Sequence, residues 1–152
     1  LSMASARAEA ETGDMIRLMH ELERRGALDR KLEDLPSDAR LADRRNAGKP
    51  LTRPELAVLM SYAKIVLFDD LLACGVTGDP YFRRELLDYF PPLMRERFET
   101  EIDGHRLRSE IIANRIGDAM INHGGPAFVS RMMEETGQNV KAIARAWALA
   151  MT

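Results

Sequence analysis

Seven prolines divide this sequence into segments whose apolar residues recur three and four positions apart. Proline lacks a backbone N–H and fixes φ, so it is tolerated at the ends of a helix and disrupts the interior. The prolines stand at the edges of these segments, at Pro36, Pro50, Pro54, Pro80, Pro91, Pro92 and Pro126. Between them, the alternation of Val, Ile, Thr and aromatic residues that is typical of strands is nearly absent. The sequence therefore predicts an all-α fold, an irregular multi-helix bundle.

The sharpest local signal marks the start of one long helix. Thr52 is expected to accept a hydrogen bond from the backbone N–H of Glu55, whose carboxylate reaches back to the N–H of Thr52. The residues that follow are apolar all round the helix axis, namely Leu56, Val58, Leu59, Met60, Tyr62, Ile65, Val66, Leu67, Phe68, Leu71 and Leu72. Such a helix is buried on most sides. We therefore expect a central buried helix at about residues 52–74.

The pattern of the N-terminal third also predicts helices. Residues 3–25 form one helix or a pair, interrupted at Thr12-Gly13-Asp14 or continuous, with Gly26 as the stop. Ser37 is expected to cap a helix that runs through Arg45. Residues 1–50 are expected to connect to an upstream domain. The chain opens at Leu1 without an initiator methionine, so we expect residues 1–152 to be a single helical domain within a longer polypeptide.

The second half predicts a series of shorter helices. Asp79-Pro80 begins one helix, and a stripe of Met94, Phe98 and Ile102, spaced four apart, indicates a second that ends near Gly104. A longer helix follows at about 106–122. The last two helices follow the turn Gly124-Gly125-Pro126, and the final one carries Trp147.

Composition excludes several classes of protein. Lys and Arg total 22 against 24 Asp and Glu, and no stretch is strongly basic, which argues against nucleic-acid binding. The most apolar stretch, from Leu56 to Phe68, is short and contains Lys64, which argues against a membrane role. Cys74 is the only cysteine, so no internal disulfide forms and a cytoplasmic location is expected.

The sequence offers no arrangement typical of an active site. A nicotinamide site needs a strand, a glycine-rich turn and a helix, and Gly124-Gly125-Pro126 follows a helix instead. His20, His105 and His123 include no closely spaced pair that would hold a metal. We therefore predict no catalytic, cofactor-binding or metal-binding residue in this chain. A small helical enzyme that uses His105 or Cys74 would require these residues to converge in a pocket.

One helix carries a row of polar residues that is a candidate docking face. Asn114, Arg115, Asp118 and Asn122 lie within one arc of the helix at 106–122 and form what we call the polar stripe. It is either an ordinary solvated face or a surface for a partner. Trp147 is likewise either a core residue or a contact with a neighbouring domain.

The order of motifs resembles the region that follows the nucleotide-binding domain in the large bacterial NAD-specific glutamate dehydrogenases. The resemblance is collinear from Met15 nearly to Thr152. It is carried by segments 17–19, 28–30, 35–38, 51–59, 62–64, 79–82, 89–91, 95–98, 110–113, 125–129 and 134–137.

The resemblance implies a function for the complete enzyme that this segment does not perform alone. Members of that family oxidatively deaminate glutamate to 2-oxoglutarate and ammonium with NAD, and they assemble as homo-oligomers. Their catalytic and NAD-binding residues lie upstream of this segment. The first hypothesis is therefore a non-catalytic C-terminal domain that contacts the upstream catalytic domains of its own polypeptide. The alternative is a free-standing helical protein-interaction module.

Overall fold

The computed structural model describes residues 3–49 and 51–151, and the side chains from Thr12 onward. Every regular element in these residues is helical, which confirms the all-α prediction. The α-helices are α1 (Met3–Arg24), α2 (Asp38–Asn46), α3 (Arg53–Ala73), α4 (Arg83–Tyr89), α5 (Pro92–Arg97), α6 (Glu99–Asp103), α7 (Arg108–Gly124), α8 (Phe128–Thr136) and α9 (Val140–Ala150). Two 3-10 helices, η1 (Val76–Gly78) and η2 (Pro80–Phe82), join α3 to α4. Leu1 and Pro50 lie outside the described residues.

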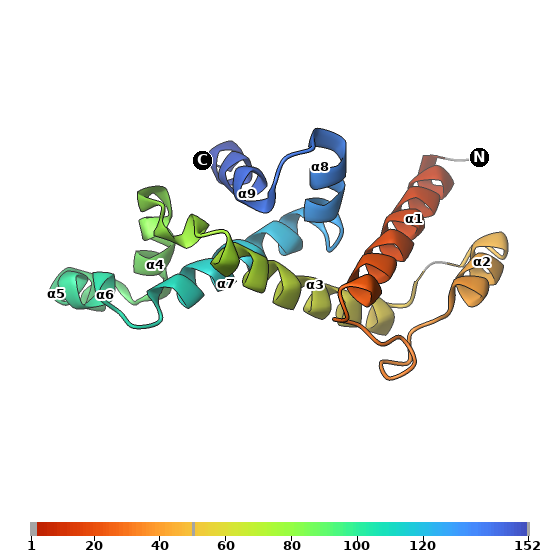
Figure 1. Cartoon of the computed structure of the whole chain (residues 1–152), viewed down its shortest axis with the longest axis horizontal. Coiled ribbons are helices and arrows are strands. Elements are labelled where there is room, and N and C mark those ends of the chain that lie inside the picture. The colour runs from red at the N-terminus through yellow and green to blue at the C-terminus, as the bar shows by residue number, and fades with distance from the viewer. Residues whose placement is uncertain (1–2, 50, 152) are drawn as a thin grey trace.

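The long helices α3 and α7 pack against each other along the middle of the molecule (Figure 1). Helices α1 and α2 lie at one end, α5 and α6 lie at the other, and α8 and α9 pack beside the central pair. The buried residues of α3 recur every fourth position, at Glu55, Leu59, Ala63, Leu67 and Leu71. This spacing places them on one helix face, which is the face turned to the rest of the core.

Helix α3 is central, as predicted, but its burial is less complete than its composition indicated. Leu56 and Ile65 are 36% and 57% exposed. The neighbouring helices cover the face of α3 that carries Leu59 and Leu67, and they leave the opposite side open to solvent. The expectation of burial on most sides was therefore wrong for these outer positions.

Helix α1 runs without a break through Thr12-Gly13-Asp14, so the interruption left open by the sequence does not occur. The carboxylate of Asp14 lies 2.5 Å from the guanidinium of Arg17 in the same helix and 3.6 Å from that of Arg131 in α8. These ion pairs stabilise the helical turn at the position where Gly13 would weaken it.

The predicted helix with Met94, Phe98 and Ile102 is divided into α5 and α6. Phe98 has φ −130° and ψ 34°, outside the helical region, and separates the two. Only Ile102 of the three is buried, whereas Met94 and Phe98 are exposed. Arg83 at the start of α4 binds two carboxylates on α6, so α6 packs against α4.

The buried side chains form one core that extends from Leu18 in α1 to Ala148 in α9. Its largest fully buried members include Phe82, Met19 and Met120, which come from distant parts of the sequence. A single core that includes both the first and last helices makes the described residues one packed unit.

Candidate docking surface

The polar stripe lies on α7, as predicted, but two of its four residues have partners inside the chain. The guanidinium Nε of Arg115 lies 3.4 Å from a carboxylate oxygen of Glu85 on α4. Asp118 lies 3.5 Å from the ammonium of Lys64 on α3. These pairs connect α7 to α4 and α3, so Arg115 and Asp118 help to hold α7 against these two helices.

Asn114 and Asn122, the other two residues of the polar stripe, are exposed. They are eight positions apart on α7, which places them about 2.2 helical turns apart and about 80° apart around the helix axis. Each side-chain amide offers two donors and an acceptor to a partner. Asn114 and Asn122 are therefore the uncharged, hydrogen-bonding members of the polar stripe that face solvent, next to the side chain of Asp118, which is 44% exposed.

Trp147 is half-buried on α9 and packs against the core. Its ring lies 6.3 Å, centroid to centroid, from that of His123 near the end of α7. The structure thus brings Trp147 close to the end of α7 that carries Asn122.

The predicted cap at the start of α3 is present and is joined by a residue that the sequence did not indicate. The hydroxyl of Thr52 accepts from the N–H of Glu55 and donates to its carboxylate at 2.7 Å. Arg44 on α2 donates to both carboxylate oxygens of Glu55 at 2.7 Å. Burial raises the pKa of Glu55, but the hydrogen bonds from Thr52 and Arg44 outweigh it and hold that pKa below its ordinary value.

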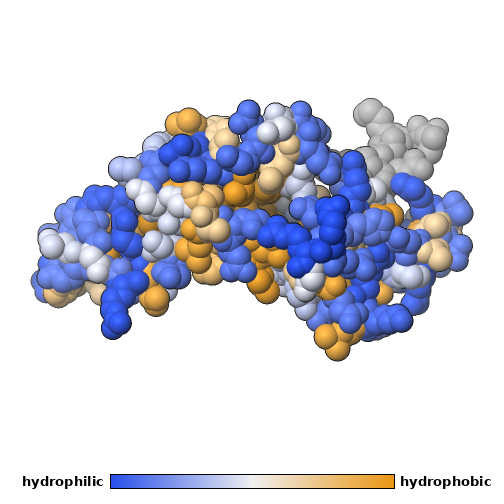
Figure 2. Space-filling model, in the orientation of Figure 1, coloured by the Kyte–Doolittle hydropathy of each residue, from blue (hydrophilic) through white to orange (hydrophobic). Residues whose placement is uncertain are grey.

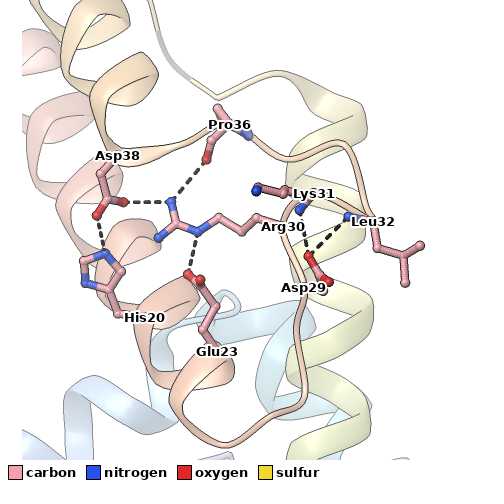
Figure 3. A network of polar contacts seen from close by, with 8 residues as sticks. All are labelled: His20, Glu23, Asp29, Arg30, Lys31, Leu32, Pro36 and Asp38. Carbon is pink, nitrogen blue, oxygen red and sulfur yellow. Dashed lines mark hydrogen bonds and ion pairs between the residues drawn. The ribbon is translucent and has the colours of Figure 1, made fainter.

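A second polar network holds α1, α2 and the loop between them (Figure 3). The side chain of Arg30, which is 13% exposed, donates to Glu23 on α1 at 2.5 Å and to Asp38 on α2 at 2.7 Å. It also donates to the carbonyl oxygen of Pro36 at 3.2 Å. His20 on α1 lies 2.7 Å from the other carboxylate oxygen of Asp38. Sequence reasoning missed this network, because no local pattern links residues 20, 23, 30 and 38.

The carboxyl of Asp38 is the junction of that network. Hydrogen bonds from Arg30 and then from His20 hold the pKa of Asp38 below its ordinary value. Asp38 is also the first residue of α2, where a negative charge interacts favourably with the helix dipole. Ser37 caps the same helix by accepting from the N–H of Arg40, as predicted.

The histidines and the cysteine that the sequence analysis considered for metal binding or catalysis form hydrogen bonds within the chain. His105 accepts from the N–H of Leu107 at 3.0 Å, and His123 bonds the carbonyl oxygen of Ala119 at 2.8 Å. The thiol of Cys74 donates to the carbonyl oxygen of Leu71 at 3.3 Å, at the end of α3. In the described part of the chain, no group of His, Cys, Asp and Glu is arranged to hold a metal ion.

The turn Gly124-Gly125-Pro126 joins α7 to α8 through a close contact. A Cβ atom on Gly124 would lie 2.5 Å from Cγ of Phe128, and Gly125 has φ +87°. Both positions need glycine, the first for space and the second for its backbone conformation. This agrees with the structural turn that the sequence indicated.

A cleft of about 210 Å³ lies between α1 and α8. Three acidic and three arginine side chains line it, namely Asp14, Glu21, Glu134, Arg17, Arg24 and Arg131. Because Asp14 pairs with both Arg17 and Arg131, the charges in this cleft largely neutralise one another. The cleft therefore shows no preference for an anion or a cation.

None of the helices in the described residues combines the length and the apolarity needed to cross a bilayer.

Comparison with known proteins places the chain in a family. Residues 48–152 match the sequence model of a family described as glutamate dehydrogenase, C-terminal. The chain is 44% identical to the NAD-specific glutamate dehydrogenase of Pseudomonas aeruginosa over 98% of its own length and 9% of that protein. It is 40% identical to the enzyme of the same name from Halomonas elongata, over 99% of this chain and 9% of that protein.

A third relative supports the same assignment. The NAD-specific glutamate dehydrogenase of Mycobacterium tuberculosis is 38% identical over 72% of this chain and 7% of that protein. The chain thus spans less than a tenth of the length of these relatives, and no solved structure matches it. The resemblance carried by the motifs is confirmed: this chain belongs to the NAD-specific glutamate dehydrogenase family, within the region described as C-terminal.

Proposed function

We propose that this chain is the non-catalytic helical C-terminal domain of an NAD-specific glutamate dehydrogenase. The complete polypeptide would convert L-glutamate, NAD and water into 2-oxoglutarate, ammonium and NADH, with NAD held by residues outside this chain. The observation that carries the proposal is the match of nearly the whole chain to about 9% of two such enzymes. That relationship favours a domain of a larger enzyme over a free-standing interaction module.

The role that we propose for the domain is structural, in contacts between domains or in assembly. Residues 1–50 would connect it to the upstream catalytic domain. The networks around Arg30 and Arg44 support this role, because they fasten α1 and α2 to each other and to α3. Because these contacts hold the helices together, the orientation of residues 1–50 relative to the catalytic domain would also fix the orientation of the other helices. The complete enzyme would be a cytoplasmic homo-oligomer.

The polar stripe and Trp147 are the surface that we propose for contact with the catalytic domains. Asn114 and Asn122 support the proposal, because both are exposed and neutral amides are inexpensive to desolvate compared with charges. Arg115 and Asp118 would contribute by holding α7 in position through Glu85 and Lys64.

Deletion of the domain tests the proposed function. The complete enzyme and a version that lacks residues 1–152 would be compared for glutamate-dependent NADH formation and for oligomeric mass by light scattering. We expect the truncated enzyme to lose thermal stability or to change its oligomeric mass, and this chain by itself to show no turnover. Turnover by this chain alone, or a truncated enzyme that is unchanged in activity, stability and mass, would contradict the proposal.

A further inference from the structure

Five large apolar side chains are exposed at the end of the molecule formed by α4, α5 and α6. They are Tyr89, Leu93, Met94, Phe98 and Leu107, with exposed fractions of 55%, 57%, 41%, 47% and 55%, and we call them the apolar patch. The other exposed large apolar side chains among the described residues are spread over α3, α8, α9 and the loop after α1. Figure 2 shows apolar residues at the margin of the end formed by α5 and α6, whose surface is otherwise mostly hydrophilic.

The apolar patch is presented by a fixed scaffold. Arg83 on α4 donates to Asp103 through two nitrogens at 2.8 Å and to Glu99 at 2.5 Å, so α6 is held against α4. The ring of Phe90 lies 5.7 Å, centroid to centroid, from that of His105, so the end of α4 also contacts the segment between α6 and α7. Helix α5, which precedes the anchored α6, has no buried residue.

The exposed side of α5 has the spacing of a contact surface. Met94 and Phe98 are four positions apart, and the N–H of Phe98 donates to the carbonyl oxygen of Met94 at 2.8 Å. This bond closes the last turn of α5 and keeps the two exposed residues next to each other. No helix in the described part of the chain covers Met94 and Phe98, which are 41% and 47% exposed.

The size of the apolar patch indicates what kind of partner covers it. Five side chains that are each about half exposed present roughly 400 Å² of surface, about half of the ~800 Å² that each protein contributes to a stable interface. A surface of this size is small for a stable interface between separate proteins, and it suits a covalently joined partner, because a linker raises the effective concentration to the millimolar range.

The comparisons and the shape of the molecule supply such a partner. The relatives are about ten times as long as this chain, and the region that it matches is described as C-terminal. The N-terminal end, where a preceding domain would join, lies at the opposite end of the molecule from α5 and α6 (Figure 1). Attachment at one end leaves a domain free to swing, and a second contact at the other end would fix its orientation.

We propose that the apolar patch docks on an apolar surface of the preceding part of the same polypeptide. This inference rests on the proposed function and adds a second surface, besides the polar stripe and Trp147, through which the domain would meet the rest of its enzyme. The domain would then be attached at two places, by the covalent connection near α1 and by the apolar patch near α5. The whole length of the domain would therefore lie along the catalytic part.

Oxidation of methionine side chains in the complete enzyme tests the proposal. Met94 and Met133 are 41% and 39% exposed in this chain, so they form a matched pair. Each rate of sulfoxide formation would be divided by the rate for the same methionine in the urea-unfolded enzyme. We expect Met94 to oxidise several times more slowly than Met133. Equal rates would overturn the proposal.

A pair of substitutions in the complete enzyme makes the test specific. Leu93 and Ile65 are both 57% exposed, but only Leu93 belongs to the apolar patch. We expect Leu93→Glu to accelerate oxidation of Met94 several-fold and Ile65→Glu to leave that rate unchanged. The same acceleration in both variants would overturn the proposal. So would a protection of Met94 that disappears on dilution to separate subunits, because it would assign the patch to a neighbouring subunit.

The two proposals fail in different ways. If the domain deletion damages the enzyme while Met94 oxidises as fast as Met133, the proposed function stands and the docking site is wrong. If the deletion leaves stability, mass and activity unchanged, the proposed function itself is wrong, whatever the rate of Met94 oxidation.

Discussion

Arg44 near the end of α2 and Glu55 in the first turn of α3 form an ion pair in which one guanidinium nitrogen lies 2.7 Å from both carboxylate oxygens. Glu55 is only 9% exposed, and its carboxylate also accepts a hydrogen bond from the hydroxyl of Thr52. One carboxylate therefore closes the cap of the central helix and attaches α2 to it.

Glu55→Gln should destabilise the chain by about 2 kcal/mol, because it leaves the partly buried guanidinium of Arg44 without a charged partner. Urea unfolding followed by circular dichroism at 222 nm would measure the change. Glu96→Gln, at an exposed position on α5, is the control and should change the free energy of unfolding by less than about 0.5 kcal/mol. Equal effects of the two substitutions would show that the ion pair contributes nothing measurable.

The same carboxylate predicts a loss of stability in acid. The pKa of Glu55 in the folded chain lies below its ordinary value of 4.5, since the hydrogen bonds of Thr52 and Arg44 outweigh burial. The contribution of Glu55 to stability is therefore complete above about pH 4.5 and is lost as the pH falls through the folded-state pKa. The difference in free energy of unfolding between the wild type and Glu55→Gln should shrink over that range. A difference that is constant from pH 7 to pH 3 would contradict the assignment.

Two glycines of α7 should respond in opposite directions to alanine. A Cβ at Gly117 would lie 3.6 Å from Cδ1 of Leu71, an ordinary contact, so Gly117→Ala should stabilise the chain by up to about 1 kcal/mol through helix propensity. A Cβ at Gly124 would lie 2.5 Å from Phe128, so Gly124→Ala should destabilise the chain by about 1–3 kcal/mol. Thermal unfolding of both variants measures the signs, and the same sign for both would refute this account of the packing.

Local signals in the sequence were sufficient for most helix boundaries. Ser37, Thr52 and Asn139 each cap the helix that follows them, because a side-chain oxygen accepts a backbone N–H two or three positions on. These interactions depend on neighbours in the chain, so a pattern of residues is enough to predict them. The central place of α3 was likewise visible in its run of apolar residues.

Contacts between distant residues could not be predicted in this way. Arg83 meets Glu99 and Asp103, sixteen and twenty positions away, on a segment that spacing alone predicted to continue the helix of α5. Arg30 likewise gathers residues from two helices and a loop, and Arg115 binds Glu85 across α4 and α7. A charged side chain has many candidate partners in a sequence that is 30% charged, so only the fold selects among them.

Arg30→Gln should loosen α2 from α1. The substitution removes the charge that binds Glu23 and Asp38, and we expect a loss of about 2 kcal/mol because the side chain is only 13% exposed. Hydrogen exchange should accelerate in residues 36–46 and remain unchanged in α9. Lys31→Gln, at the exposed neighbouring position, is the control. Exchange in residues 36–46 that is the same in both variants would show that Arg30 does not fasten the two helices.

The polar stripe should separate into residues that stabilise the domain and residues that are free for a partner. Arg115→Ala removes the contact with Glu85 and should cost about 0.5–1 kcal/mol, as expected for a partly exposed ion pair. The double variant Asn114→Ala/Asn122→Ala should leave the free energy of unfolding of this chain within about 0.5 kcal/mol, because both amides are exposed. In the complete enzyme, the double variant should instead increase hydrogen exchange in whatever segment covers α7. Unchanged exchange throughout the complete enzyme would mean that Asn114 and Asn122 face solvent there too, and that the polar stripe is not a docking face.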